Sequence, residues 1–416
     1  MAFCLDTYLQ QSDDYEILAS QAGFKDCAMI IRFKADEVIN VKPGEEILGV
    51  RIIGVPPIPI GIKNDEHKVL IPYTKPCHGT SVVELPIDEE EIEKIKKLAW
   101  FIMFSTVVGS FPVEMEEPTS FKDKLLNVFN LYDPYKIAIK NAVYKQLDAG
   151  IDVVSDGQVR GDMVTAFTRY IPGMKLEGTQ TVINGKIRRP SKEITTSDLR
   201  YAKSLINKYY DGDIPDKKGI KGIITGPSTI VYSSRISHFY RNKNDAVLDL
   251  ADSLKYEAMA IEKKVNPKYI QIDEPFLSTG LVDLDNAKEA IDIISESVDV
   301  PVSMHVCGTL DNVFKDLTRF NIDILDCEFA GNDVNLDVLK ENVNLLKNKK
   351  LGFGCIDSSV NEVDSFEDVK NLVGEAISIV GKDNLILDPD CGLRKTSPDV
   401  AFEKLKLITK AEKEFS

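Results

Sequence analysis

Eight short runs rich in β-branched and other apolar residues recur along the chain, and this repetition limits the possible folds more than any other feature. The runs are residues 104–108, 151–154, 222–225, 269–272, 301–304, 322–325, 350–353 and 385–387. Several are separated by stretches with the spacing of amphipathic helices. Eight parallel strands with crossover connections predict a closed (β/α)8 barrel, an α/β fold of the TIM type. An open doubly wound sheet is the main alternative, and the number of runs does not exclude it.

Residues 1–98 have a different pattern, in which short apolar runs are separated by Pro and Gly turns. We interpret them as a small α+β domain of unknown role, with a short helix at 15–22. Residues 87–99 carry acids, then lysines, with apolar residues at helical spacing, which predicts a helix that connects this domain to a barrel at 99–416. Within the barrel, residues 163–203 have glycines among alternating residues and predict an inserted hairpin.

Charge and cysteine content restrict partners and compartment. The chain has 51 basic and 66 acidic residues and a net charge of −15, which argues against nucleic-acid binding. Its seven cysteines are sparse and odd in number, and its start lacks a basic region followed by an apolar run, so we expect a reducing, cytoplasmic compartment without disulfides. The most apolar early stretch, 52–62, is shorter than the roughly 20 residues of a membrane-spanning helix. We therefore expect small molecules or proteins as partners, and no membrane.

Each of the eight runs ends in small, polar or metal-binding residues. These segments are residues 109–112, 155–158, 226–228, 273–275, 305–307, 326–328, 354–357 and 388–392. In a barrel the carboxyl ends of all strands meet at one rim, where such enzymes hold their active sites. We therefore expect these segments to converge on one pocket.

Four residues of these segments, His305, Cys307, Glu328 and Cys391, offer the ligand types that zinc prefers. In an extended strand, side chains two positions apart point the same way, as His305 and Cys307 require. For Cys327 a packing role is favoured, because it directly precedes Glu328 and should face the opposite way. Two thiolates and a carboxylate more than cancel the charge of zinc, so the ion suits binding of a substrate thiol better than activation of water. The predicted chemistry is alkyl transfer to sulfur.

The ordered strand ends resemble the catalytic barrel of cobalamin-independent methionine synthase. The matching segments are 107–112, 156–164, 271–275, 305–307, Glu328 and 388–393, within a similarity that covers about residues 100–416. The resemblance implies a (β/α)8 barrel whose zinc, bound by residues matching His305, Cys307, Glu328 and Cys391, activates homocysteine for methylation to methionine. It also implies that Asp273 and the backbone around Val108, Gly109 and Ser110 hold the amino-acid end of the substrate.

The chain is too short for the two barrels of the folate-dependent members. It is more similar to short archaeal members, and this resemblance implies a methyl-corrinoid donor, either methylcobalamin or a corrinoid protein. The first domain resembles an uncharacterised domain of methanogenic archaea, which we expect to dock a partner or cover the rim.

Two positions depart from the family pattern. Gln158 stands where the family has a glutamate that binds the substrate ammonium group, so the pocket has one charge less. After Asp357, a candidate catalytic residue, the chain has Ser358 and Ser359 where the long enzymes have a histidine thought to relay a proton. Losing the charge-assisted contact at Gln158 costs about 1 to 2 kcal/mol. Another small thiol, such as coenzyme M, is therefore an alternative acceptor. A non-catalytic interaction or regulatory subunit is the alternative of another class.

Overall fold

The computed structural model describes residues 103–113 and 132–415, with the exception of residue 348. It also describes a few positions between 115 and 129 and separate strands and turns within residues 10–92. The chain divides into two compact units, Met1–Ile102 and Met103–Ser416. In the described part of the chain, none of the helices combines the length and the apolar character needed to cross a membrane.

The described part of the first unit consists mainly of antiparallel strands. They are β1 (Gln10–Gln11), β2 (Tyr15–Ala19), β3 (Met29–Phe33), β4 (Glu37–Val41), β5 (Glu46–Ile47), β6 (Val50–Arg51), β7 (Ile58–Lys63), β8 (Lys68–Lys75) and β9 (Gly79–Pro86). The main sheet has the order β4-β7-β8-β9. Its buried apolar residues include Ile60, Ile62, Val69 and Ile71.

The predicted helix at 15–22 is wrong over its described residues. Tyr15–Ala19 is strand β2, which pairs antiparallel with β3 and places Ile17 opposite Ile31. A short apolar run fits either structure, and pairing with a neighbouring strand decides between them. Of the predicted connecting helix, Glu91 and Ile92 are helical, and most of the remainder lies outside the described residues. Four other residues also lie outside them: Cys4, Cys27, Cys77 and Trp100.

All eight predicted runs of the second unit contain strands. The barrel strands are β10 (Phe104–Ser105), β11 (Val153–Val154), β14 (Gly219–Ile220), β15 (Gly222–Thr225), β17 (Ile270–Asp273), β18 (Val302–Val306), β19 (Ile324–Glu328), β20 (Lys350–Ile356) and β21 (Leu385–Pro389). Seven of them form a parallel sheet in the order β10-β21-β20-β19-β18-β17-β15.

Strand β11 closes this sheet into a barrel. Val153 of β11 forms a parallel bridge with Thr106, which follows β10, and β11 pairs in parallel with β14. Strand β14 continues into β15 through Lys221, whose backbone N–H donates to the carbonyl of Val154 at 3.0 Å. The (β/α)8 barrel is therefore confirmed, and the open doubly wound sheet is excluded.

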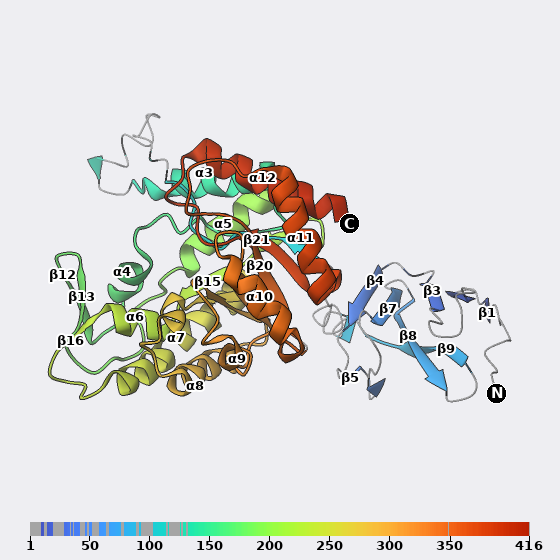
Figure 1. Ribbon diagram of the computed structural model, residues 1–416, viewed down its shortest axis with the longest axis horizontal. Coiled ribbons are helices and arrows are strands. Elements are labelled where there is room, and N and C mark those ends of the chain that lie inside the picture. Colours follow the sequence, from blue (N-terminus) through green and yellow to red (C-terminus); the bar gives the residue numbers. More distant parts are fainter. Residues whose placement is uncertain are drawn as a thin grey trace. The chain divides into compact units, whose positions relative to one another are not determined.

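Helices surround the barrel strands, as Figure 1 shows for β15, β20 and β21. The longer ones are α3 (Tyr135–Asp148), α5 (Thr196–Tyr209), α7 (Lys243–Val265), α8 (Leu284–Ser295), α10 (Asp333–Asn342), α11 (Phe366–Val380) and α12 (Pro398–Phe415). The short ones are α4 (Met163–Thr168), α6 (Pro227–Ser233), α9 (Phe314–Leu317) and the 3-10 turns η1 (Pro275–Thr279), η2 (Val343–Leu345) and η3 (Lys382–Asn384).

Helix α7 shows how the sequence produces this ring. The Asn242 side chain accepts a hydrogen bond from the backbone N–H of Asp245 and caps the first turn. Leu250, Leu254 and Ile261 recur on one face at helical spacing and are buried in the barrel core. The same pattern in the other helices encloses the strands and leaves the strand ends to form the rim.

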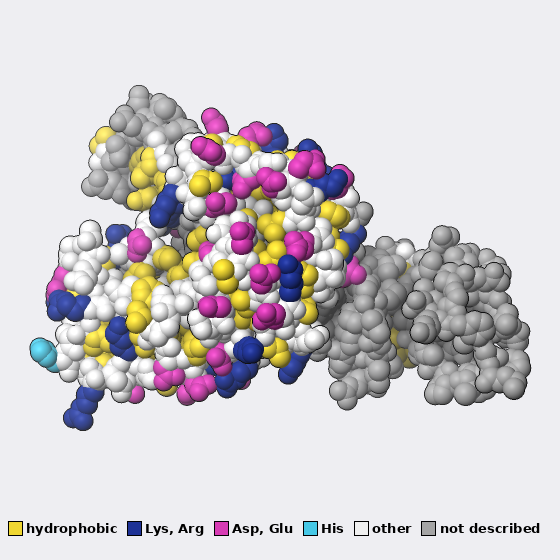
Figure 2. Space-filling model, in the orientation of Figure 1, with side chains coloured by type: hydrophobic (Ala, Val, Ile, Leu, Met, Phe, Trp, Pro, Cys, Tyr) yellow, Lys and Arg dark blue, Asp and Glu magenta, His cyan; other side chains and the backbone are white. Residues whose placement is uncertain are grey.

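The predicted hairpin insertion is present within residues 163–203. Strands β12 (Met174–Glu177) and β13 (Gln180–Ile183) pair antiparallel, and β16 (Arg235–Ile236) adds to β13. The same segment also contains α4 and the start of α5, so the insertion is only partly a hairpin. On the face of the barrel shown in Figure 2, acidic and basic side chains are interspersed.

Candidate metal centre and substrate pocket

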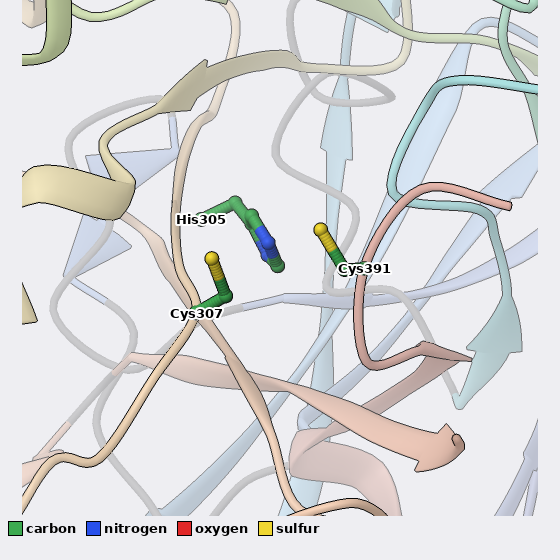
Figure 3. A group of neighbouring side chains, drawn as sticks. All are labelled: His305, Cys307 and Cys391. Carbon is green, nitrogen blue, oxygen red and sulfur yellow. The ribbon is translucent and has the colours of Figure 1, made fainter. Parts of the chain in front are cut away.

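His305, Cys307 and Cys391 lie together at the carboxyl ends of β18 and β21. Their ligand atoms are all within 4.8 Å of one another, and they form a metal-competent group among the described residues. Figure 3 shows the imidazole ring of His305 between the two sulfur atoms. The residues come from strand ends far apart in sequence, and closure of the barrel brings them together.

A buried carboxylate orients the imidazole. His305 Nδ1 lies 3.1 Å from Asp326 Oδ1, and the two residues are direct neighbours in the pairing of β18 with β19. A Cβ atom at Gly352, on the next strand, would lie 2.6 Å from the Asp326 Cβ, so only glycine leaves room for this carboxylate. Burial is the largest single influence on the pKa of His305 and lowers it, but the charge and hydrogen bond of Asp326 and the neighbouring Cys307 and Cys391 together raise that pKa well above its usual range.

The second ring nitrogen is suited to a metal. His305 Nε2 is buried and has no hydrogen-bond partner, whereas Asp326 occupies Nδ1. Metal-binding histidines commonly donate one N–H to a carboxylate and coordinate through the other nitrogen. One imidazole and two sulfurs are among the ligands that zinc takes in proteins. The described residues therefore fit zinc.

The pKa values of the two cysteines are shifted in opposite directions. The hydrogen bond between their thiols is the largest cause that lowers the pKa of Cys391, to about 4, and it raises the pKa of Cys307 above its usual range. His305 lowers the pKa of both. Coordination of a metal requires both sulfurs to be deprotonated.

Glu328, the fourth predicted ligand, is not part of this group. It ends β19, one residue beyond the pair Val306–Cys327, so its backbone lies beside that of Cys307. Its carboxylate accepts a hydrogen bond from Asn332 Nδ2 at 3.4 Å instead.

Asp390 was not predicted, although it stands next to Cys391. Its buried carboxylate accepts hydrogen bonds from the backbone N–H groups of Phe329, Ala330 and Gly331, at 2.9, 3.0 and 2.6 Å. It therefore fixes the loop that follows Glu328 to the strand end that carries Cys391. Burial is the largest cause that raises the pKa of Asp390, to about 7, while the three donors lower it.

Three residues predicted to bind substrate lie together beside the metal group. Gln158 Nε2 donates to Asp273 Oδ2 at 3.4 Å, and a Cβ at Gly109 would lie 2.9 Å from the Gln158 amide oxygen. Asp273 is also the pairing neighbour of His305. Burial raises the pKa of Asp273 to about 6, although His305 opposes this effect.

The other predicted substrate contacts belong to residues 108–110, which follow β10. The carbonyl of Val108 accepts from Gln271 Nε2 at 2.7 Å, and the carbonyl of Gly109 accepts from Ser155 Oγ at 2.6 Å. Ser110 lies against the segment after Cys391, because a Cβ at Gly392 would be 2.0 Å from its Oγ. The backbone of residues 108–110 is thereby held beside the metal group.

Asp357 is not part of the metal group. Its Oδ1 accepts hydrogen bonds from the backbone N–H and the hydroxyl of Ser359, at 2.8 and 2.6 Å. The Nζ of Lys404, a buried lysine of α12, donates to the carbonyl of Asp357 at 2.7 Å. Cys327 and Cys355 are buried in the hydrophobic core, which agrees with packing roles.

Comparison with known proteins covers most of the chain. The model of the family "Cobalamin-independent synthase, Catalytic domain" matches residues 103–414, and residues 2–96 match a domain of unknown function, DUF1894. Proteins named methionine synthase from Methanothermobacter thermautotrophicus and Methanocaldococcus jannaschii are 47% and 44% identical, over 74% and 75% of this chain and 99% of each relative.

A solved structure shares the fold. The B12-independent methionine synthase of Shewanella sp. W3-18-1 has a TM-score of 0.62 at 22% identity, over 76% of this chain and 98% of that chain. The family predicted from the strand-end motifs is thus confirmed. The chain belongs to the cobalamin-independent synthase catalytic-domain family, and it is an enzyme of the methyltransferase class.

Proposed function

We propose that the barrel transfers a methyl group from a methyl-corrinoid donor to the sulfur of homocysteine and forms methionine, with zinc held by His305, Cys307 and Cys391. The observation that carries this proposal is the group formed by the buried imidazole of His305 and two partly buried sulfurs, beside Asp273. Glu328 remains the predicted fourth ligand. In the net reaction the carbon–cobalt bond breaks with its electron pair left on cobalt, the carbon–sulfur bond forms, and the thiol loses its proton.

The ion supplies one function when bound, which is to lower the pKa of the substrate thiol so that its sulfur is a thiolate at neutral pH. The residues of the chain do the rest. Asp273 offers a carboxylate to the substrate ammonium group, and the backbone after Val108 offers N–H donors and the Ser110 hydroxyl to the substrate carboxylate. Asp326 holds the His305 ring through Nδ1 and leaves Nε2 as the nitrogen that would coordinate the ion.

Metal analysis combined with a methyl-transfer assay tests the proposal. The purified protein should contain about one zinc per chain, and it should demethylate methylcobalamin only when a thiol is supplied. A panel with homocysteine, coenzyme M and 2-mercaptoethanol identifies the acceptor. Protein that binds no zinc, or that methylates none of these thiols, would overturn the proposal. Preference for coenzyme M would replace homocysteine with the alternative acceptor.

Gln158→Glu is expected to lower the KM for homocysteine by about 5- to 20-fold, since a second carboxylate beside Asp273 adds a charge-assisted contact to the ammonium group. The same change should raise the KM for coenzyme M, an anion. Steady-state kinetics with both thiols measure the ratio. An unchanged ratio would show that residue 158 does not face the substrate ammonium group.

A further inference from the structure

Lys221 is a fully buried lysine for which the proposed chemistry has no role. It lies between β14 and β15 and its side chain is 0% exposed. Its Nζ donates to Gln271 Oε1 at 2.5 Å and lies 5.5 Å from the centroid of the Tyr269 ring. Taking an ammonium group out of water costs several kcal/mol unless it is well paired, so its presence in the barrel interior requires a reason.

Gln271 connects this lysine to the proposed substrate pocket. Its Nε2 donates to Asp273 Oδ1 at 2.6 Å and to the Val108 carbonyl at 2.7 Å. The proposed function assigns Asp273 to the ammonium end of the amino acid and the segment after Val108 to its carboxylate end. The side-chain amide of Gln271 therefore contacts both parts of the proposed site for the amino-acid end of the substrate.

Lys221 determines which way the amide faces. An ammonium group only donates hydrogen bonds, so the Gln271 oxygen must face Lys221 and the nitrogen must face its two acceptors. With no donor at position 221, the amide is free to turn, and its oxygen would then repel the Asp273 carboxylate. Burial lowers the pKa of Lys221, but the carboxylates of Asp326, Asp388 and Asp273 oppose this effect and favour the charged form.

We infer that Lys221 and Gln271 are positioning residues that fix the Asp273 carboxylate and the Val108 backbone for the amino-acid end of the substrate. This inference rests on the proposed function. Neither residue touches the substrate; Lys221 acts through Gln271, and Gln271 acts through Asp273 and Val108. Their loss should impair recognition of an amino acid while leaving zinc binding intact.

Three variants test the positioning role of Lys221 and Gln271: Lys221→Met, Gln271→Met and the double variant. Each should weaken binding of methionine, the proposed product, by about 10-fold or more in calorimetric titration, with zinc content unchanged. The kcat/KM for homocysteine should fall by a similar factor, whereas that for 2-mercaptoethanol, which has no ammonium group, should not. Because Lys221 acts through Gln271, the double variant should lose no more affinity than Gln271→Met alone.

The double variant also guards against a folding defect. It leaves neither an unpaired ammonium group nor an unpaired amide, and apolar replacement of a buried polar pair is often neutral for stability. Tyr269→Phe is the matched control, since it removes a buried hydroxyl bonded to Thr106 and should leave methionine affinity unchanged.

The outcomes separate the two hypotheses. A wild-type protein that neither binds methionine nor methylates homocysteine contradicts the proposed function. If the wild-type protein does both and the double variant keeps its methionine affinity, the result contradicts only the positioning role of Lys221 and Gln271.

Discussion

Cys391→Ala is expected to abolish stable zinc binding and to reduce methyl transfer to homocysteine by at least about 100-fold. The substitution removes one of the two sulfurs in the group that lies within 4.8 Å. His305, Cys307 and the predicted Glu328 would then offer zinc only one thiolate. Without the ion, only a few per cent of a free thiol is thiolate at pH 7. Zinc per chain after dialysis and the rate of methylcobalamin demethylation measure the two effects.

Cys327→Ala is the matched control for this experiment. It also removes a cysteine sulfur at a strand end, but Cys327 packs in the hydrophobic core and lies outside the metal group. We expect it to keep zinc and turnover and to lose about 1 kcal/mol of stability. A Cys391→Ala protein that retained one tightly bound zinc would contradict the ligand assignment.

The barrel was predictable because its strands are buried on both faces. Such strands appear in sequence as short continuous apolar runs, and every run contains a strand, although β19 extends three residues beyond the predicted 322–325. The first unit was less predictable. Tyr15–Ala19 is a strand because it pairs with β3, and this partner is not evident from the run itself.

Part of the arrangement at the strand ends was predictable. Strand-end position indicated His305, Cys307 and Cys391, because the topology of a barrel alone brings strand ends together. The placement of Glu328 depends on its side-chain conformation and on its contact with Asn332, which no sequence spacing encodes.

No role was predicted for the supporting residues. Asp326 lies beside His305 because of strand register, and Lys221, which directly precedes β15, meets Gln271 of the neighbouring strand β17. The available signals were a lysine directly before one apolar run and an aspartate directly after another, since such groups are rarely buried without partners.

Asp326→Asn is expected to weaken zinc affinity by about 10- to 100-fold, the usual effect of losing a carboxylate behind a metal-binding histidine. Asp326 lies 3.1 Å from His305 Nδ1, and its charge favours the tautomer with the proton on Nδ1 and the lone pair on Nε2. An asparagine can present either its oxygen or its NH2 group to the ring, so both the charge and the selection of tautomer are weakened. Competition with a chelator of known affinity measures the change.

Ser303→Ala is the control for Asp326→Asn. Ser303 lies two residues before His305 on β18, and its buried hydroxyl has no hydrogen-bond partner among the described residues. Its removal should leave zinc affinity unchanged. If Asp326→Asn bound zinc as tightly as Ser303→Ala, the ring of His305 would have to be held by its packing alone. Burying a carboxylate costs free energy, so that result would also leave the steric requirement for glycine at position 352 without a functional reason.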